Sequence, residues 1–235
     1  MVRSEPNLAG HDRRYSSGMT ILDYLDQHLI PRAELLRAAA LDDAQLARMQ
    51  ALGAVPMPSY RLALEMSCES FFGSHQEHAE REYYASGCAA WIATVSATQE
   101  PPQRIFERRY RARLAALHAE GFATGHQKCN EELAAHLRDE WKYFLDGTYG
   151  VCTKTGAPED IAAKDLAVTI IKALTENQPK RVLTVEDSVA LLRAVDLLDA
   201  SSAPFAPHEV AHSSRRRLID DVRAAYFPAT ANCLR

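Results

Sequence analysis

Most of the sequence repeats apolar residues at helical spacing between clear start and stop signals. After Thr20, a capping side chain is followed by an acid three residues later, and leucines then recur every three or four positions up to Pro31. The segment 101–122 has prolines at its start and Gly121 past its last apolar turn, which is the usual placement of both residues around a helix. Strand signals are scarce, so the sequence predicts an all-α fold.

The remaining helices are predicted from the same signals, at 31–40, 42–53, 130–147, 158–177, 184–200 and 207–227. The stretch 60–91 is compatible with helix or strand, and Gly73 and Gly87 are expected to interrupt it. A proline-rich segment at 55–60 separates two parts of the chain. We therefore predict a flexible lead over 1–18, a small helix-turn-helix-like unit of three helices over 19–55, and an irregular multi-helix main domain over 56–235.

Composition and charge favour a soluble cytoplasmic protein. The formal net charge is -4, which argues against nucleic acid as the main partner because phosphate-binding domains carry a basic excess. The five cysteines are odd in number and include no CxxC pair, which is typical of reduced thiols in a cytosol. No apolar run approaches the ~18 residues that would span a bilayer, and the first residues lack the apolar core of a secretory signal.

The loop "GTYGVCTKT" at 147–155 contains glycines and a Lys-Thr pair, which invites comparison with a nucleotide phosphate loop. That motif has a glycine directly before the lysine and a strand before the loop. Here Lys154 follows Thr153, and the preceding segment is predicted to be helical, so a nucleotide loop is excluded. Lys154 could instead bind a smaller oxyanion, although Glu159 and Asp160 would repel one. A purely structural turn is the alternative.

Two pairs of potential metal ligands are three residues apart: His75 with His78, and His126 with Cys129. On helices, each pair could face one way, and together they could supply four ligands. Isolated pairs at this spacing arise easily by chance, and the sequence contains no CxxC motif. No metal and no cofactor is predicted.

A basic ridge is predicted on the helix at 101–122, where Arg104, Arg108 and Arg111 fall on one side while the apolar residues turn inward. The ridge is either a solvated face or a docking surface for an acidic partner protein, since complementary charge accelerates and orients such encounters.

Glu65 and Glu69 are four positions apart. On a helix, both carboxylates would share one face, where mutual repulsion and burial would raise the pKa of one and suit it to accept a proton. Two exposed glutamates are the alternative. Nearby serine, phenylalanine, glycine and histidine residues favour the interpretation as a site.

The segments "EWKYFLDGTYGVCTKT" and "SSRRRLIDDVRAAYF" resemble a family of actinobacterial natural-product biosynthesis proteins. Within it, the chain is most similar to the subunits that form the aziridine ring in azinomycin- and vazabitide-type pathways. The resemblance implies an aziridine-forming cyclase, in which an amine attacks the adjacent carbon that bears a sulfate ester, and sulfate leaves. It also implies no redox cofactor, a second protein subunit in a hetero-oligomer, and an acidic amino-group carrier protein that bears the substrate.

Candidate residues for this chemistry follow from residue type and clustering. An amine of pKa ~10 is mostly protonated at neutral pH and needs a base, for which we select Glu69, with Glu65 in reserve. Residues that could wall the substrate or bind the departing sulfate are Tyr60, Arg61, His75, Trp141, Tyr149 and Lys154. The alternatives are a non-catalytic partner or scaffold subunit of a biosynthetic complex, and a helix-turn-helix regulator.

Overall fold

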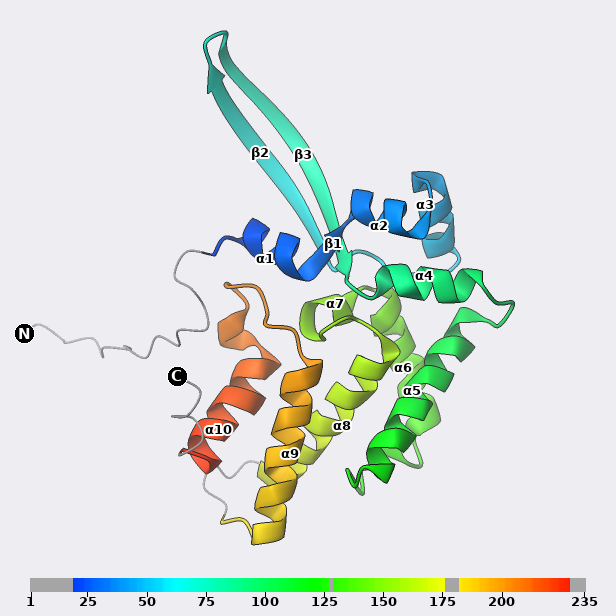
Figure 1. Ribbon diagram of the computed structural model, residues 1–235, viewed down its shortest axis with the longest axis vertical. Coiled ribbons are helices and arrows are strands. Elements are labelled where there is room, and N and C mark those ends of the chain that lie inside the picture. Colours follow the sequence, from blue (N-terminus) through cyan, green and yellow to red (C-terminus); the bar gives the residue numbers. More distant parts are fainter. Residues whose placement is uncertain (1–18, 127–128, 176–181, 229–235) are drawn as a thin grey trace, which may run out of the picture.

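The computed structural model describes residues 19–126, 129–175 and 182–228 (Figure 1). The predicted lead over 1–18 lies outside these ranges. The N-terminal part contains three helices and a short strand: α1 (Ile21–His28), β1 (Leu29–Pro31), α2 (Arg32–Ala39) and α3 (Asp43–Ala51). A long hairpin and a short helix follow: β2 (Tyr60–Ser70), β3 (Gly73–Ala85) and α4 (Cys88–Ser96). The helical body comprises α5 (Pro102–Ala119), α6 (Leu133–Leu145), α7 (Thr148–Cys152), α8 (Pro158–Thr175), α9 (Val185–Ser201), η2 (Val210–His212), η3 (Arg216–Asp220) and α10 (Asp221–Tyr226).

The prediction of an all-α fold is wrong. The chain is 60% helical but also contains a three-stranded antiparallel sheet, in the order β1-β3-β2. In the stretch left open between helix and strand, Leu62, Leu64 and Met66 alternate with more polar residues, and β2 pairs with β3 along its whole length, from Tyr60 opposite Tyr83 to Ser70 opposite Gly73. Alternation with a period of two places these side chains on one face of a strand.

Three helix starts that were predicted from local signals agree with the structure. Thr20 caps α1 in a reciprocal capping box with Asp23, and Asp42 caps α3 in the same way. Thr184 caps α9 by accepting a hydrogen bond from the Asp187 N–H. The predicted start of the helix over 130–147 is wrong, because a turn intervenes and α6 begins at Leu133.

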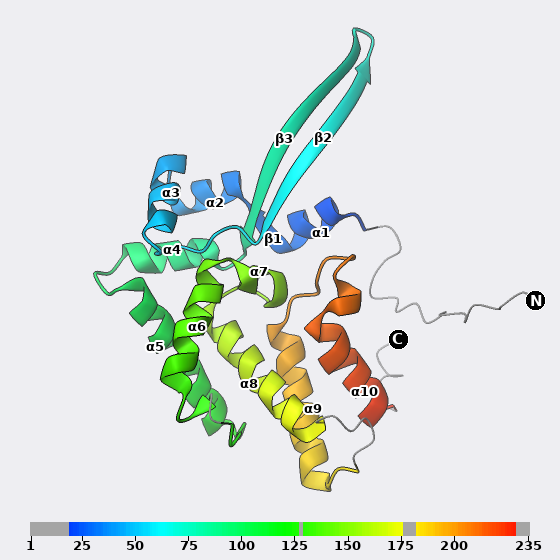
Figure 2. The ribbon, with the colours of Figure 1, turned by 180° about the vertical axis from the view of Figure 1, so that it is seen from behind.

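The helical body is a bundle in which α8 packs between α5 and α9, with α6 against α5 and with η3 and α10 against α9 (Figures 1 and 2). Its core is one large apolar cluster that also includes Leu35 of α2 and Leu46 of α3. A second, smaller cluster joins α1 and β1 to the base of the hairpin through Tyr24, Leu25 and Tyr83. The division at residue 55 stays a prediction, although the two parts share core contacts.

The β2–β3 hairpin, which we call the arm, projects away from the rest of the molecule (Figures 1 and 2). Its base is buried through Tyr83 and Tyr84, whereas every residue from Glu65 to His78 is exposed. No described helix is both long and apolar enough to cross a membrane.

Candidate functional site

A cavity of about 300 Å³ lies where α1, the end of β3 and the helical body meet. This volume is at the small end of the range for ligand sites. Its walls come from four separate parts of the chain: Tyr24, His28 and Leu29; Ala85 and Ser86; Gly150 with 153–155; and Asp199, Ala200 and 202–204. The loop singled out in the sequence therefore forms one wall of a cavity.

The backbone of this wall is held by a short stretch of strand-like pairing with the end of α9. Thr153 forms an isolated antiparallel bridge with Ser202, and the Lys154 N–H donates to the Ser201 carbonyl at 2.9 Å. The buried Thr153 hydroxyl donates to the Tyr149 carbonyl at 2.6 Å and accepts from the Gly156 N–H at 2.9 Å. Lys154 thus sits on a fixed backbone with an exposed side chain.

The two acids expected to repel an anion are both engaged elsewhere. Arg109 holds Glu159 in a two-pronged ion pair, at 2.7 and 2.8 Å. Asp160 accepts from the Thr155 N–H at 2.9 Å and from the Thr155 hydroxyl at 2.6 Å. Neither acid lines the cavity. The repulsion that the sequence predicted between these two acids and an anion bound at Lys154 is therefore weaker than expected.

Asp199, a carboxylate on the cavity wall, is also neutralised by partners. It accepts from Arg223 at 2.7 Å and from Arg215. Burial raises the pKa of Asp199, but the two arginines outweigh burial and hold the pKa below its ordinary value. Asp199 is therefore ionised and paired at neutral pH, which leaves the Lys154 charge on this wall available to a ligand.

Two further polar residues that line the cavity, Ser202 and His28, were missed by sequence reasoning. The Ser202 hydroxyl is buried, in a residue only 6% exposed, and has no hydrogen-bond partner within the described ranges. The His28 ring lies at the end of α1, 4.9 Å from the Tyr24 ring between centroids. Burial lowers the pKa of His28 from its ordinary value of 6.5, so the ring is neutral at pH 7 and can accept a proton.

The lowered pKa of His28 predicts a pH dependence of stability. Because the folded state disfavours the charged ring, the contribution of His28 is fully present above pH 6.5 and is lost as the pH falls through the folded-state pKa. We expect the wild type to lose more unfolding free energy than His28→Gln between pH 7.5 and pH 5.5. Urea unfolding at the two pH values measures this, and equal losses would show that His28 does not titrate in this way.

A separate buried polar cluster lies inside the helical body, where α5, α6, α7 and α8 meet. Asp165 accepts from the Tyr110 hydroxyl at 2.8 Å and lies 2.7 Å from His136 Nε2. Glu140 accepts from the Tyr149 hydroxyl and lies 3.6 Å from His136 Nε2. Burial, reinforced by the nearby carboxylates, raises the pKa of both tyrosines. Both hydroxyls therefore remain donors, and the cluster fixes α7 and the loop that follows it.

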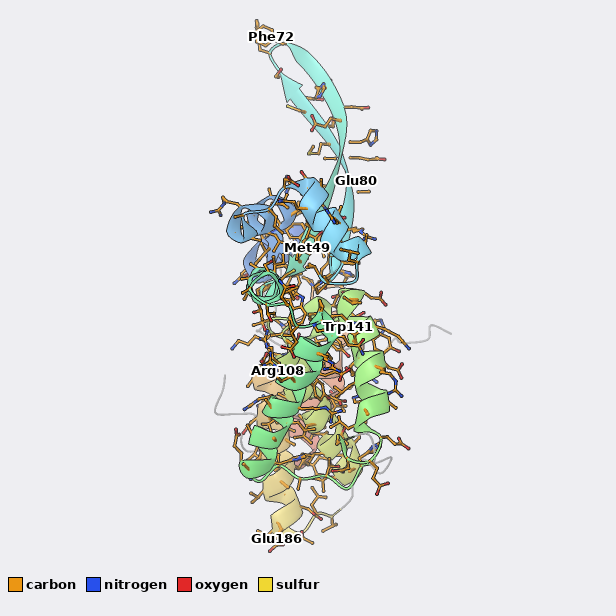
Figure 3. All side chains as sticks on the ribbon, turned by 90° about the vertical axis from the view of Figure 1, so that its right-hand side faces the viewer. Met49, Phe72, Glu80, Arg108, Trp141 and Glu186 are labelled. Atoms are coloured by element: carbon orange, nitrogen blue, oxygen red, sulfur yellow. The ribbon has the colours of Figure 1, made fainter. Side chains whose placement is uncertain are left out.

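The structure does not bring the predicted site residues together. Glu65, Glu69 and His75 lie on the exposed part of the arm, and Figure 3 shows the arm tip at Phe72 far from Trp141 in the helical body. The interpretation of Glu65 and Glu69 as a site assumed a helix, on which the repulsion between the two carboxylates would be strong. On a strand they share a face but are ~13 Å apart, which is longer than the screening length of about 8 Å at physiological ionic strength.

The other predicted residues are also distributed. Trp141 belongs to the core and stacks on Phe144 at 5.4 Å between ring centroids. Tyr60 and Arg61 lie at the base of the arm, where Tyr60 donates to Glu209 at 2.7 Å and Arg61 contacts Glu82 at 3.4 Å. The Tyr149 hydroxyl belongs to the buried cluster described above. Of the predicted set, Lys154 alone is on the cavity wall.

The candidate metal ligands are not arranged as pairs. His75 and His78 lie on β3, where residues three apart point to opposite faces. Cys129 is buried and His126 is exposed. Among the described residues, no group of three or more His, Cys, Asp or Glu side chains could hold a metal ion.

Comparison with known proteins identifies a family. The model of a family described as "Family of unknown function (DUF6058)" matches residues 102–227. No curated protein and no solved structure matches the chain. The matched segment includes the cavity wall around Lys154 and Asp199 and the whole buried cluster, whereas His28 and the arm lie outside it. Since the match spans more than half of the sequence, the chain belongs to the DUF6058 family.

Proposed function

We propose that the protein is a cytoplasmic biosynthetic enzyme that closes an aziridine ring with loss of sulfate. The observation that supports this proposal is the cavity with Lys154 on its wall. Its charge is not taken by Glu159, Asp160 or Asp199, each of which is held by other groups. A cation on the cavity wall suits the oxygens of a sulfate ester and of the departing sulfate.

The reaction needs few groups. The substrate nitrogen forms a bond to the adjacent carbon, the bond from that carbon to the ester oxygen breaks, and sulfate leaves with the electron pair. The proton of the amine must go to a base. The predicted bases Glu65 and Glu69 lie on the arm, so we propose His28 for this role, because it lines the cavity and burial keeps its ring in the neutral form that can accept a proton.

The substrate reaches the cavity, in this proposal, on an acidic amino-group carrier protein. Arg104, Arg108 and Arg111 are all exposed on α5, as predicted, and Arg108 pairs with Glu100 at 2.9 Å. This ridge supports docking of an acidic partner through complementary charge. The resemblance adds a second protein subunit to the complex.

We expect Lys154→Met to slow sulfate release from a carrier-linked vicinal amino sulfate by about 100-fold, as loss of a charge-stabilising group does in other enzymes. Lys142→Met is the matched control, because Lys142 is an exposed lysine on α6 that pairs with Asp139. Sulfate release is measured in the presence of the partner proteins. Equal rates for both variants would refute the assignment of Lys154.

A binding test needs no substrate. Low millimolar sulfate, compared with chloride at equal ionic strength, should raise the unfolding temperature of the wild type and of Lys142→Met but not that of Lys154→Met. The comparison matters because sulfate also stabilises proteins non-specifically by exclusion from their surface. The same shift in all three proteins would indicate that non-specific effect alone.

A second candidate function is a non-catalytic partner subunit, favoured by the exposed arm. In that case, sulfate release by the assembled complex would be the same with Lys154→Met and with the wild type, and it would require the arm. Lys154→Met and a variant with an altered arm, tested side by side, therefore distinguish a catalytic subunit from a scaffold.

A further inference from the structure

The arm has an apolar column on β2 whose outer part, Met66 and Cys68, is exposed in this chain. Along β2, even-numbered positions carry Leu62, Leu64, Met66 and Cys68, and odd-numbered positions carry Ala63, Glu65, Ser67 and Glu69. Such alternation is typical of a strand with one face buried and one face in water. Leu62 packs against the small core at the arm base, but Met66 is 40% exposed.

Beyond the apolar column, two phenylalanines form the turn at the arm tip. Phe71 and Phe72 are each 95% exposed, and their rings make an edge-to-face contact with 5.3 Å between centroids. Figure 3 shows Phe72 at the far end of the molecule. Hairpin turns favour glycine, asparagine and aspartate, so two adjacent aromatic side chains in this turn are not required for the turn itself.

We propose that the arm mediates dimerisation, with the apolar columns of two copies packed against each other around a two-fold axis. A symmetric dimer needs a self-complementary surface, and an apolar strand face meets this condition. A lone two-stranded hairpin is also marginally stable in water, whereas more strands sharing an apolar face are stable. The inference is independent of the function proposed for the cavity.

The distribution of charged side chains favours packing through the face with the apolar column over packing through the opposite face of the arm. Glu65, Glu69 and Glu80 lie on that opposite face, as the β2–β3 register shows by pairing Ala63 with Glu80. In the proposed dimer, these carboxylates point away from the partner and remain in water. On the apolar side, β3 carries Arg81 opposite Leu62 and Glu77 opposite Met66, and the Glu77 carboxylate lies 3.4 Å from His75.

The available area predicts a modest affinity. Two phenylalanines bury roughly 300–500 Å² per copy, and Met66 with its neighbours adds to this. Stable interfaces bury about 800 Å² per partner, and weaker, transient ones bury less. We therefore expect a reversible dimer with a dissociation constant on the order of micromolar.

Sedimentation velocity of the full chain over ~1–200 μM tests the proposal. The wild type should shift from monomer to dimer across this range. Met66→Glu should weaken dimerisation at least ~100-fold, because it buries a charge in the apolar column. Ser67→Glu is the matched control, since it introduces the same side chain one residue away on the water-facing side, and it should change the dissociation constant less than ~3-fold.

The outcomes are decisive in both directions. A monomeric wild type throughout the concentration range, or equal weakening by Met66→Glu and Ser67→Glu, would overturn the proposal. The double substitution of Phe71→Ser with Phe72→Ser should also give a monomer. Far-UV circular dichroism should show unchanged helix content in every variant, because these residues lie outside the core.

Discussion

We expect Asp165→Ala to lower the free energy of unfolding by about 3–5 kcal/mol, as does removal of one member of other buried charged pairs. The Asp165 side chain is only 16% exposed, and it accepts the Tyr110 hydroxyl and contacts His136. Alanine would leave both partners buried without this acceptor. Urea unfolding followed by circular dichroism measures the change in midpoint.

The matched control is Asp139→Ala, on the neighbouring helix α6. Asp139 also pairs with a cation, Lys142, at 2.8 Å, but its side chain is 62% exposed. Water replaces such a partner at little cost, so the control should change the unfolding midpoint by no more than the error of the measurement. Similar losses from both variants would mean that burial does not determine the strength of the Asp165 contacts.

The helix ends were predictable because their signals are local. Thr20, Asp42 and Thr184 each satisfy a backbone N–H three residues further along the chain, so a short window of sequence contains the whole interaction. Pro102 at the start of α5 and Gly121 after its end have the same local character. Tertiary packing did not need to be known.

The arm was not predictable to the same degree, because a spacing of four positions is compatible with both a helix and a strand. Residues i and i+4, such as Glu65 and Glu69, share a face on a helix and on a strand. The choice between helix and strand at 60–91 depends on the pairing of β2 with β3 and of β3 with β1, and β1 is more than 50 residues away in sequence. The error in fold class arose at this point.

The cavity and the buried cluster depend on long-range contacts. His136 and Asp165 are 29 positions apart, and the cavity joins His28 to Lys154 and Ser202. The sequence did contain one usable signal, since His136 and Glu140 are four positions apart on a predicted helix and therefore share a face. Lys154 was identified because a lysine in a glycine-containing loop is visible locally. The neutral His28 and the Ser202 hydroxyl, which has no partner among the described residues, become notable only when their surroundings are known.

The backbone around the loop at 147–155 requires glycine for a structural reason, which can be tested at Gly147. Its φ of +76° is in the left-handed region, and a β-carbon added there would lie 2.4 Å from the Met57 carbonyl oxygen. We expect Gly147→Ala to cost about 3–5 kcal/mol of unfolding free energy. Backbone strain contributes ~1–2 kcal/mol of this, and the rest comes from displacement of the 57–58 backbone against α7.

Gly53→Ala separates the two contributions. Gly53 also has a left-handed φ, +63°, but a β-carbon there would meet only Leu145 Cδ1 at 3.5 Å, an ordinary contact. The expected loss is therefore the strain alone, ~1–2 kcal/mol. Equal losses at the two positions in urea unfolding would mean that the segment at 57–58 moves freely. The loop carrying Lys154 would then be less firmly held against the start of the arm than the close approach at Gly147 implies.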